Sequence, residues 1–151
     1  MSEPDTLSSI GPILDRFGIR WIVIGAIAAN RYRRDVRLTG DLDLLLSSHG
    51  RGLTELEATL GSGGWTVRRG TPDGAILRLR HGTFGSVDVI LAETGYQHEA
   101  IERSATEQRA DGTIVRVLRV EDVLVHKLIA GRPRDLADIE DILACRPGFD
   151  E

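Results

Sequence analysis

Three aspartates carry the chemistry that this sequence suggests: Asp41 and Asp43 in the stretch TGDLDLLL, and Asp88 in the stretch SVDVIL. Side chains of a β-strand alternate between its two faces, so Asp41 and Asp43 would point the same way while Leu42 points the other way. Carboxylates grouped in an apolar run are costly to remove from water unless a cation lies among them. A divalent metal ion, which prefers hard oxygen ligands, is the simplest such cation.

A strand, a turn and a helix lead up to the first two aspartates. The apolar residues 20–24 predict a short buried strand that stops at Gly25 and Ala26, where glycine permits a tight turn and the close approach of a ligand. A short helix follows, and residues 37–46 predict the strand with the paired aspartates. Residues 86–91 predict the strand of the third aspartate. If these two strands adjoin, the three carboxylates meet at one edge of a sheet and could hold one or two Mg²⁺ (or Mn²⁺) ions.

The rest of the pattern predicts an α/β (α+β) protein, a small mixed sheet with flanking helices. Apolar residues at helical spacing predict four longer helices, and β-branched or alternating runs predict further strands. The expected helices cover residues 5–17, 51–60, 121–130 and 135–144, and the further strands cover residues 65–69, 75–80 and 113–118. We expect one domain over residues 1–151, with its core at about 20–92 and a C-terminal helical segment at about 120–146.

Composition narrows the class of protein. The chain has 151 residues, of which 41% are hydrophobic and 28% charged, as is ordinary for a soluble globular domain. The net charge of -4 argues against a generally basic protein that coats nucleic acid. The single cysteine, Cys145, excludes an internal disulfide and Cys-rich zinc sites. No apolar run reaches the roughly 20 residues of a transmembrane helix, and the N-terminus lacks the pattern of a secretory signal, so we expect a cytoplasmic protein without a membrane partner.

In their order along the chain, these features resemble the nucleotidyltransferase fold of the polymerase-beta type. The residues that carry the resemblance are Gly25-Ala26, then Arg37-x-Thr39-x-Asp41-x-Asp43, then Asp88 on a later strand. Within that fold the sequence is most similar to the AbiEii-like group, to which many toxins of toxin–antitoxin systems belong. The C-terminal run EDVLVHKLIAGRPRDLADIEDIL resembles the helical segment of the same group. The resemblance covers roughly residues 20–145.

The resemblance implies a role for each matching aspartate and for the nucleotide-binding positions. Asp41 and Asp43 would bind the metal ions, and Asp88 would complete the metal site and act as the base for the acceptor hydroxyl. The implied nucleotide-binding residues are Gly25 and Ala26 beneath the phosphates, Arg37 beside the aspartate strand, and Lys127 facing the triphosphate.

Other matching positions leave more than one role open. Thr39 is expected to be structural, and Arg132, Asp135 and Asp138 of the tail motif could form structural salt bridges or contribute to function. Ala26 departs from the pattern, because many members have Ser or a second Gly there. Backbone N–H groups could still bind phosphate at such a turn.

The implied enzyme is an Mg²⁺-dependent nucleotidyltransferase that moves an NMP group from an NTP to a hydroxyl acceptor. The acceptor could be a tRNA end, a protein side chain or a small molecule such as an aminoglycoside, and the chain could act in a toxin–antitoxin system with a cognate partner. Several arginines could contact a phosphate backbone or, as is more common for such residues, only solvate the faces of strands and helices, namely Arg31, Arg33, Arg34, Arg68, Arg69, Arg78 and Arg80.

Two other classes of function remain open. A non-catalytic relative could bind a partner protein, which Ala26 favours. A glycosyltransferase also uses a D-x-D pair to chelate the metal of a nucleotide sugar, but that fold normally needs a longer chain. The four histidines show no metal-ligand spacing, and we expect His49, His81, His98 and His126 at surface or ordinary helix positions.

Overall fold

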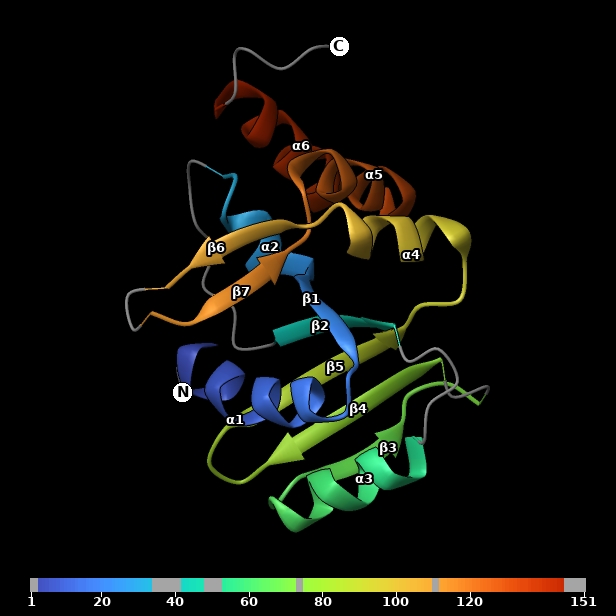
Figure 1. Ribbon diagram of the computed structural model, residues 1–151. Helices are drawn as coiled ribbons and strands as arrows, with labels where there is room; N and C mark the ends of the chain where they lie inside the picture. Colours follow the sequence, from blue (N-terminus) through green and yellow to red (C-terminus); the bar gives the residue numbers. More distant parts are fainter. Residues whose placement is uncertain (1–2, 34–41, 48–52, 73–74, 110–111, 146–151) are drawn as a thin grey trace.

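The computed structural model describes residues 3–33, 42–47, 53–72, 75–109 and 112–145. These residues form six helices and a seven-stranded mixed sheet, which confirms the predicted α/β class (Figure 1). The helices are α1 (Glu3–Arg16), α2 (Gly25–Asn30), α3 (Leu53–Ser62), α4 (Gly95–Glu102), α5 (Val120–Ala130) and α6 (Pro133–Cys145). The strands are β1 (Arg20–Ile24), β2 (Leu42–Ser47), β3 (Thr66–Arg69), β4 (Ile76–His81), β5 (Gly85–Leu91), β6 (Ala105–Gln108) and β7 (Ile114–Val117).

The sheet brings together strands that lie far apart in the sequence. Its order is β3-β4-β5-β2-β1-β7-β6. β2 is antiparallel to β1 and parallel to β5, and β7 is parallel to β1. The other neighbouring pairs are antiparallel. The strand that carries Asp43 therefore lies between the first strand of the chain and the strand that carries Asp88, as predicted.

The alternation of side chains divides β2 and β5 into two faces. Leu44 on β2 is paired with Val89 on β5, and both are buried, as is Val23 on the other side of Leu44. Helices α1 and α3 supply the apolar side chains for this core, including Ile10 and Leu56. Burial of a side chain of this size contributes about 1.5–3 kcal/mol, so the packing of this face stabilises the fold.

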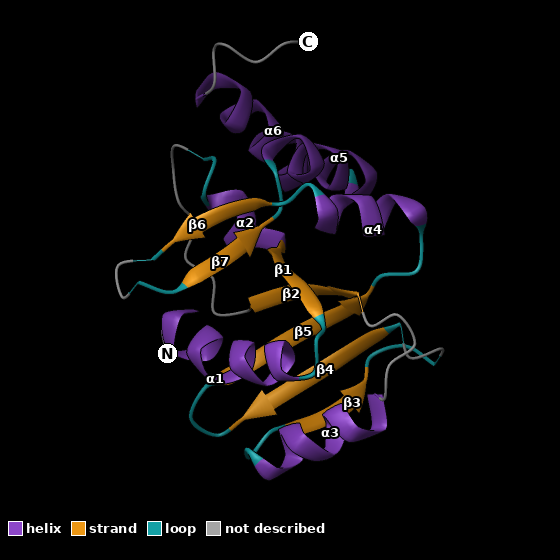
Figure 2. Cartoon of the chain, in the orientation of Figure 1, coloured by secondary structure: helices purple, strands orange, loops and turns teal. Residues whose placement is uncertain are grey.

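The remaining helices lie toward the other end of the sheet. Figure 2 shows α4, α5 and α6 grouped near β1 and β7, away from α3 and β3. Helix α5 packs on α6 and α2, and α4 packs on β1 and β2. A capping box between Thr94 and Gln97 starts α4, and Gly131, at φ 62°, ends α5.

Two elements were not predicted, and part of one prediction lies outside the described residues. Helix α4 and strand β6 both come from stretches with few apolar residues, which give little periodic signal. Of the strand expected at residues 37–46, the structure describes the part from Leu42 onward. Arg37, Thr39 and Asp41 lie outside the described residues. None of the described helices is both long enough and apolar enough to span a membrane.

Candidate active site

Two of the three predicted aspartates lie side by side on the sheet. The Cα atom of Asp43 is paired with that of Asp88 across the parallel β2–β5 ladder, and with that of Ile24 on β1. Paired residues on neighbouring strands direct their side chains to the same face, about 5 Å apart. The two carboxylates therefore share one face of the sheet, opposite the apolar face that packs on α1 and α3.

Gly25 makes room for the first of these carboxylates. It follows β1 directly and has φ +70°, a left-handed conformation that costs little only for glycine. A Cβ atom at this position would lie 2.9 Å from Cγ of Asp43 and would overlap its carboxylate. The glycine after the first strand is therefore required both by the turn and by the position of Asp43.

A pocket of about 250 Å³ opens beside Asp43 and Gly25. One wall comes from the sheet and the other from α5 and the turn into α6. Its polar lining includes Asp43, His126, Lys127, Arg132 and Asp135, and its apolar lining comprises Ile24, Ile90, Leu118, Val123 and Ala130. Two predicted nucleotide-binding residues, Gly25 and Lys127, thus border the same pocket as a predicted metal ligand.

Asp88 lies on the more open side of this region. Its side chain is 42% exposed, and the nearest ion pair described for it is with Nε of Arg78, at 3.9 Å, on the adjacent strand β4. This pair is long and solvent-exposed, and such pairs contribute little to stability. The Asp88 carboxylate is therefore accessible for further contacts.

Lys127 is held in place by two carboxylates of α6. Its Nζ donates to Oδ1 of Asp135 at 3.2 Å and to Oδ2 of Asp138 at 2.9 Å. Both aspartates are buried, and the Lys127 side chain is 14% exposed. Arg132 also donates to Asp135, through Nε at 2.6 Å and through its backbone N–H at 3.2 Å. The predicted tail-motif residues therefore form a salt-bridge network that fixes the wall of the pocket.

The electrostatics of this network keep Asp135 ionised. The hydrogen bond from Arg132 lowers the pKa of the Asp135 carboxyl to about 2, with a further contribution from Lys127 and against the effect of burial. Arg33 extends the network to the end of α2, because it forms ion pairs with Asp138 at 3.4 Å and with Asp141 at 3.6 Å. These ion pairs thus connect the end of α2 with α5 and α6.

A second cluster lies behind the pocket, between α4 and α5. Asp122 is buried and accepts two hydrogen bonds from the Arg103 guanidinium, at 2.7 and 2.8 Å, and one from the Tyr96 hydroxyl at 2.7 Å. Burial alone would raise the pKa of Asp122, but these hydrogen bonds outweigh it and lower the pKa. Burial and the bond to Asp122 raise the pKa of Tyr96 to about 12. The cluster anchors α4 to α5.

His126 connects this cluster to the pocket, and its role was missed in the sequence. It lies one turn after Asp122, its ring centroid is 6.1 Å from that of Tyr96, and it lines the pocket. Burial lowers the pKa of His126, against the charge of Asp122. The imidazole is thus mainly neutral at pH 7. The i, i+4 spacing of Asp122 and His126 was visible in the sequence, but the partners on α4 were not.

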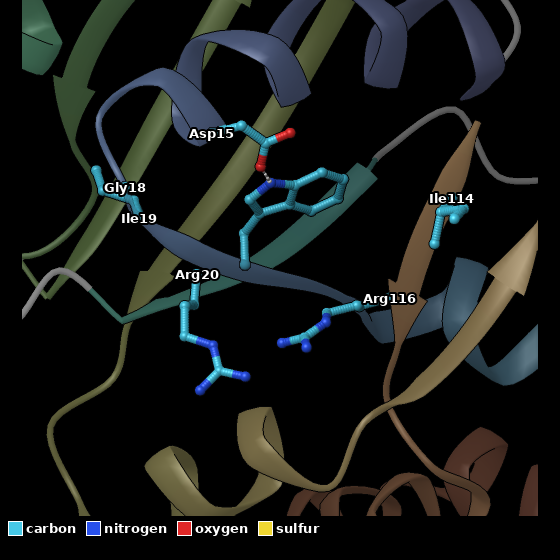
Figure 3. A pocket seen from close by; sticks show the side chains of 7 residues that line it. Asp15, Gly18, Ile19, Arg20, Ile114 and Arg116 are labelled. Carbon is cyan, nitrogen blue, oxygen red and sulfur yellow. Dashed lines mark hydrogen bonds between the residues drawn. The ribbon is translucent and has the colours of Figure 1, made fainter.

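A larger pocket, of about 380 Å³, lies at the opposite end of β1. It is lined by Asp15, Gly18, Ile19, Arg20, Trp21, Ile114 and Arg116. Figure 3 shows Arg20 and Arg116 extending to the same side of β1. Oδ1 of Asp15 accepts a hydrogen bond from the Trp21 indole at 2.9 Å, and Arg20 is paired with Glu102. None of the described site residues predicted from the sequence lines this pocket.

The donor set around Asp43 suits a hard divalent cation. Asp43 and Asp88 supply neighbouring carboxylate oxygens, the ligand type that Mg²⁺ and Mn²⁺ prefer, and Gly25 makes room for the Asp43 carboxylate. Within the described residues there is no group of three or more His, Cys, Asp or Glu side chains that could hold a metal ion. Asp41, the third predicted ligand near this position, lies outside them.

Comparison with solved structures gives the fold. Neither a family model nor the sequence of a curated protein matches the chain. The lincomycin-bound lincosamide antibiotic adenylyltransferase LnuA aligns with 94% of this chain and 96% of its own, with a TM-score of 0.62 and 13% identity. The antibiotic-resistance factor ANT(2'')-Ia aligns over 93% and 82%, with a TM-score of 0.61 and 18% identity.

Two further structures are similar to the same extent. An antigenic nucleotidyltransferase-like protein from Paracoccidioides brasiliensis aligns over 94% of this chain and 73% of its own, with a TM-score of 0.62 and 19% identity. ANT(2'')-Ia in complex with adenylyl-2''-tobramycin aligns over 91% and 86%, with a TM-score of 0.59 and 20% identity. The chain therefore has the nucleotidyltransferase fold.

Proposed function

We propose that this chain is a nucleotidyltransferase that moves an NMP group from an NTP to a hydroxyl acceptor. The observation that carries the proposal is the in-register pair of Asp43 and Asp88 beside Gly25, on the fold of known nucleotidyltransferases. Carboxylates on adjacent strands repel each other, so a cation bound between Asp43, which lines the pocket, and Asp88 would be attracted to both. Asp41 is the third residue that we assign to this site.

The cation in this proposal is Mg²⁺ or Mn²⁺. Asp41, Asp43 and Asp88 would hold it through carboxylate oxygens. When bound, such an ion offsets negative charge on the triphosphate and on the reacting oxygens.

The reaction itself is a substitution at the α-phosphorus of the nucleotide. The acceptor oxygen forms a bond to the α-phosphorus, and the bond from that phosphorus to the bridging oxygen of the β-phosphate breaks, so pyrophosphate leaves. The hydroxyl proton must be removed as the new bond forms. Asp88 is our candidate for the base, because its carboxylate is partly exposed and lies next to Asp43.

The pocket offers separate surfaces for the phosphates and for the rest of the nucleotide. We assign Gly25, Ala26, Lys127 and Arg37 to the phosphates, with Lys127 acting as a positioned point charge. The support for Lys127 is its place in the pocket wall, where Asp135 and Asp138 restrict its movement. The apolar lining and the neutral ring of His126 suit a sugar or a base.

Transfer of label from each α-labelled NTP tests this function. The protein is incubated with Mg²⁺ and pools of RNA, protein and small hydroxyl compounds, and Asp88→Asn is compared with Asp15→Asn, a matched change at the other end of β1. We expect wild type and Asp15→Asn to label one pool, and Asp88→Asn to lose at least two orders of magnitude in rate, as is typical for loss of a general base. Absence of labelling in every pool, or full activity of Asp88→Asn, contradicts the proposal.

A second candidate is a non-catalytic protein that binds a partner, as in a toxin–antitoxin pair. It is favoured by Ala26 in the glycine turn and by exposed apolar side chains on α5 and α6, among them Ile129 at 75% and Leu136 at 50%. The resemblance of the tail motif to the AbiEii-like group is the support for a toxin–antitoxin role. A partner that binds wild type and Asp43→Asn equally well, in a chain that labels nothing, would favour this candidate.

A further inference from the structure

Two arginines extend the row of residues that contains the candidate catalytic carboxylates, and a third lies next to that row. Across β3, β4, β5 and β2 the paired residues are, in order, Arg68, Arg78, Asp88 and Asp43. Arg80 lies two residues beyond Arg78 on β4 and so points to the same face. The face that carries Asp43 and Asp88 therefore continues into a cationic surface, which we call the arginine face and define as Arg68, Arg78 and Arg80.

The arginine face is accessible. All three arginines are exposed, and the side chain of Arg78 is 62% exposed. The intervening residues Leu77 and Leu79 point to the other face of β4 and are buried in the core. Among the residues of β3 and β4 there is no acidic side chain, so positive charge dominates the surface next to the proposed base.

We infer that the acceptor hydroxyl is carried on a single-stranded nucleic acid whose phosphates lie on the arginine face. The inference rests on the proposed function, since it identifies the acceptor of that reaction. Its basis is charge complementarity together with position. Among the residues of β3, β4 and β5, the only acid is Asp88, the carboxylate that would take the acceptor's proton. A phosphodiester strand that crosses β3 and β4 would bring its terminal hydroxyl to Asp88.

The spacing of the arginines favours a strand over a small phosphate compound. Arg68 and Arg78 are separated by one strand spacing of about 5 Å, and Arg78 and Arg80 by about 7 Å along β4. Their side chains are spread over two strands and exposed, whereas a site for a single phosphate would have converging, buried donors. A polycationic acceptor would be repelled here, because like charges at close range disfavour binding.

Binding of RNA without nucleotide tests the inference independently of catalysis. A short fluorescein-labelled single-stranded RNA is titrated with protein at several salt concentrations, and binding is followed by fluorescence anisotropy. The double variant Arg68→Glu/Arg80→Glu is compared with Arg69→Glu. Arg69 is the matched control, because it is equally exposed on β3 but paired with Leu77 and thus on the opposite face. Arg78 is left unchanged because it pairs with Asp88.

For the wild type we expect log K to fall with log salt with a slope of roughly −2, as three phosphate contacts on a single strand predict. The double variant should bind RNA at least roughly tenfold more weakly than the wild type, and the slope of log K against log salt should be closer to −1. Arg69→Glu should bind within about twofold of the wild type, since a charge on the far face makes none of these contacts.

Three results would overturn the inference. One is the absence of RNA binding by the wild type, and another is an equal loss in Arg69→Glu. The third is that an oligoglutamate of equal charge binds as tightly as RNA and is weakened by the double variant but not by Arg69→Glu. That result would indicate an acidic protein as the acceptor. If RNA binds as expected but no NTP gives transfer, the proposed function fails while the nucleic-acid surface stands.

Discussion

Two groups of aspartates in this molecule meet opposite conditions. Asp43 and Asp88 lie on a sheet face beside a pocket, partly exposed, and the ion pair described for Asp88 is 3.9 Å long. Asp122, Asp135 and Asp138, on the helices, are all buried, and each has a hydrogen bond of 2.9 Å or less from a cationic side chain. The two groups therefore have different surroundings.

The difference in burial and in hydrogen-bond partners distinguishes structural carboxylates from those that a ligand can reach. The helix aspartates have their negative charge offset by protein cations, so their free energy depends on those partners. The sheet aspartates are partly exposed, beside or next to a pocket, so a ligand can reach them. Substitutions in the first group should therefore change stability, and substitutions in the second should change binding and transfer.

The largest effect is expected for Asp43→Asn. Loss of a metal ligand removes charge stabilisation worth several kcal/mol, so transfer should fall by about 10³-fold or more. The free energy of unfolding should stay within about 1 kcal/mol or rise, because a like-charge neighbour of Asp88 is removed. Single-turnover transfer and urea unfolding of the same preparation measure both quantities. A loss of stability that accounts for the lost activity would place Asp43 with the structural group.

Asp138→Ala should give the converse result. It removes the carboxylate that Lys127 and Arg33 share, while Lys127 keeps its bond to Asp135 and Arg33 keeps its ion pair with Asp141. Breaking a buried ion pair in this way costs about 3 kcal/mol, equivalent to a fall in Tm of roughly 10 °C for a chain of this length. Glu140→Ala, an exposed neighbour on α6, should change stability by less than about 0.5 kcal/mol. Equal stability of the two variants would show that the network is not structural.

Gly25→Ala should lower both stability and transfer. The left-handed backbone should cost about 1–2 kcal/mol of stability, and the new Cβ should displace the Asp43 carboxylate, lowering transfer by about 10²-fold. Gly61→Ala is the control, because an added Cβ in α3 meets no atom within 4 Å and should stabilise the helix slightly. Wild-type transfer by Gly25→Ala would show that the position of Asp43 does not matter for the reaction.

The smallest effect is a pH dependence confined to the structural group. Because Arg132 and Lys127 lower the pKa of Asp135 from its usual 3.8 to about 2, its contribution to stability is complete above pH 3.8 and is lost as the pH falls through about 2. The difference in unfolding free energy between wild type and Asp135→Asn should therefore be constant near neutral pH and narrow in acid. Urea unfolding across this range measures it, and a difference that persists at pH 2 would contradict the assignment.

Much of the sheet, and the position of Asp43 beside Asp88 and Gly25, could be predicted from the sequence. The run around Ile22 is continuously apolar and the run around Val89 is apolar apart from Asp88, so their strands were clear. The alternation of side chains along a strand then indicated the face of Asp43. Gly25 was expected to permit a tight turn, and the structure adds that it makes room for Asp43. These inferences succeeded because each depends on a local pattern of side chains.

The rest depends on contacts between distant segments. Helix α4 and strand β6 are polar and short, so periodicity gave little sign of them, although the capping box at Thr94 was present in the sequence. The Tyr96–Arg103–Asp122 cluster forms because the chain crosses from β5 through α4 to α5. The opposite faces of Arg68 and Arg69 follow from strand register, which cannot be assigned to an isolated stretch of arginines.

Calorimetric titration with nucleotide tests whether Asp43 and a divalent cation bind the nucleotide together, because it reports on the sheet carboxylates without requiring an acceptor. ATP, GTP, CTP and UTP are each titrated with Mg²⁺ and with EDTA into wild type, Asp43→Asn and Asp15→Asn. We expect at least one NTP to bind wild type and Asp15→Asn roughly tenfold or more tightly with Mg²⁺ than with EDTA. We expect Asp43→Asn to lose this gain, since phosphate and carboxylate oxygens share the ion. Equal affinity with Mg²⁺ and with EDTA, or a gain that survives in Asp43→Asn, would contradict this expectation.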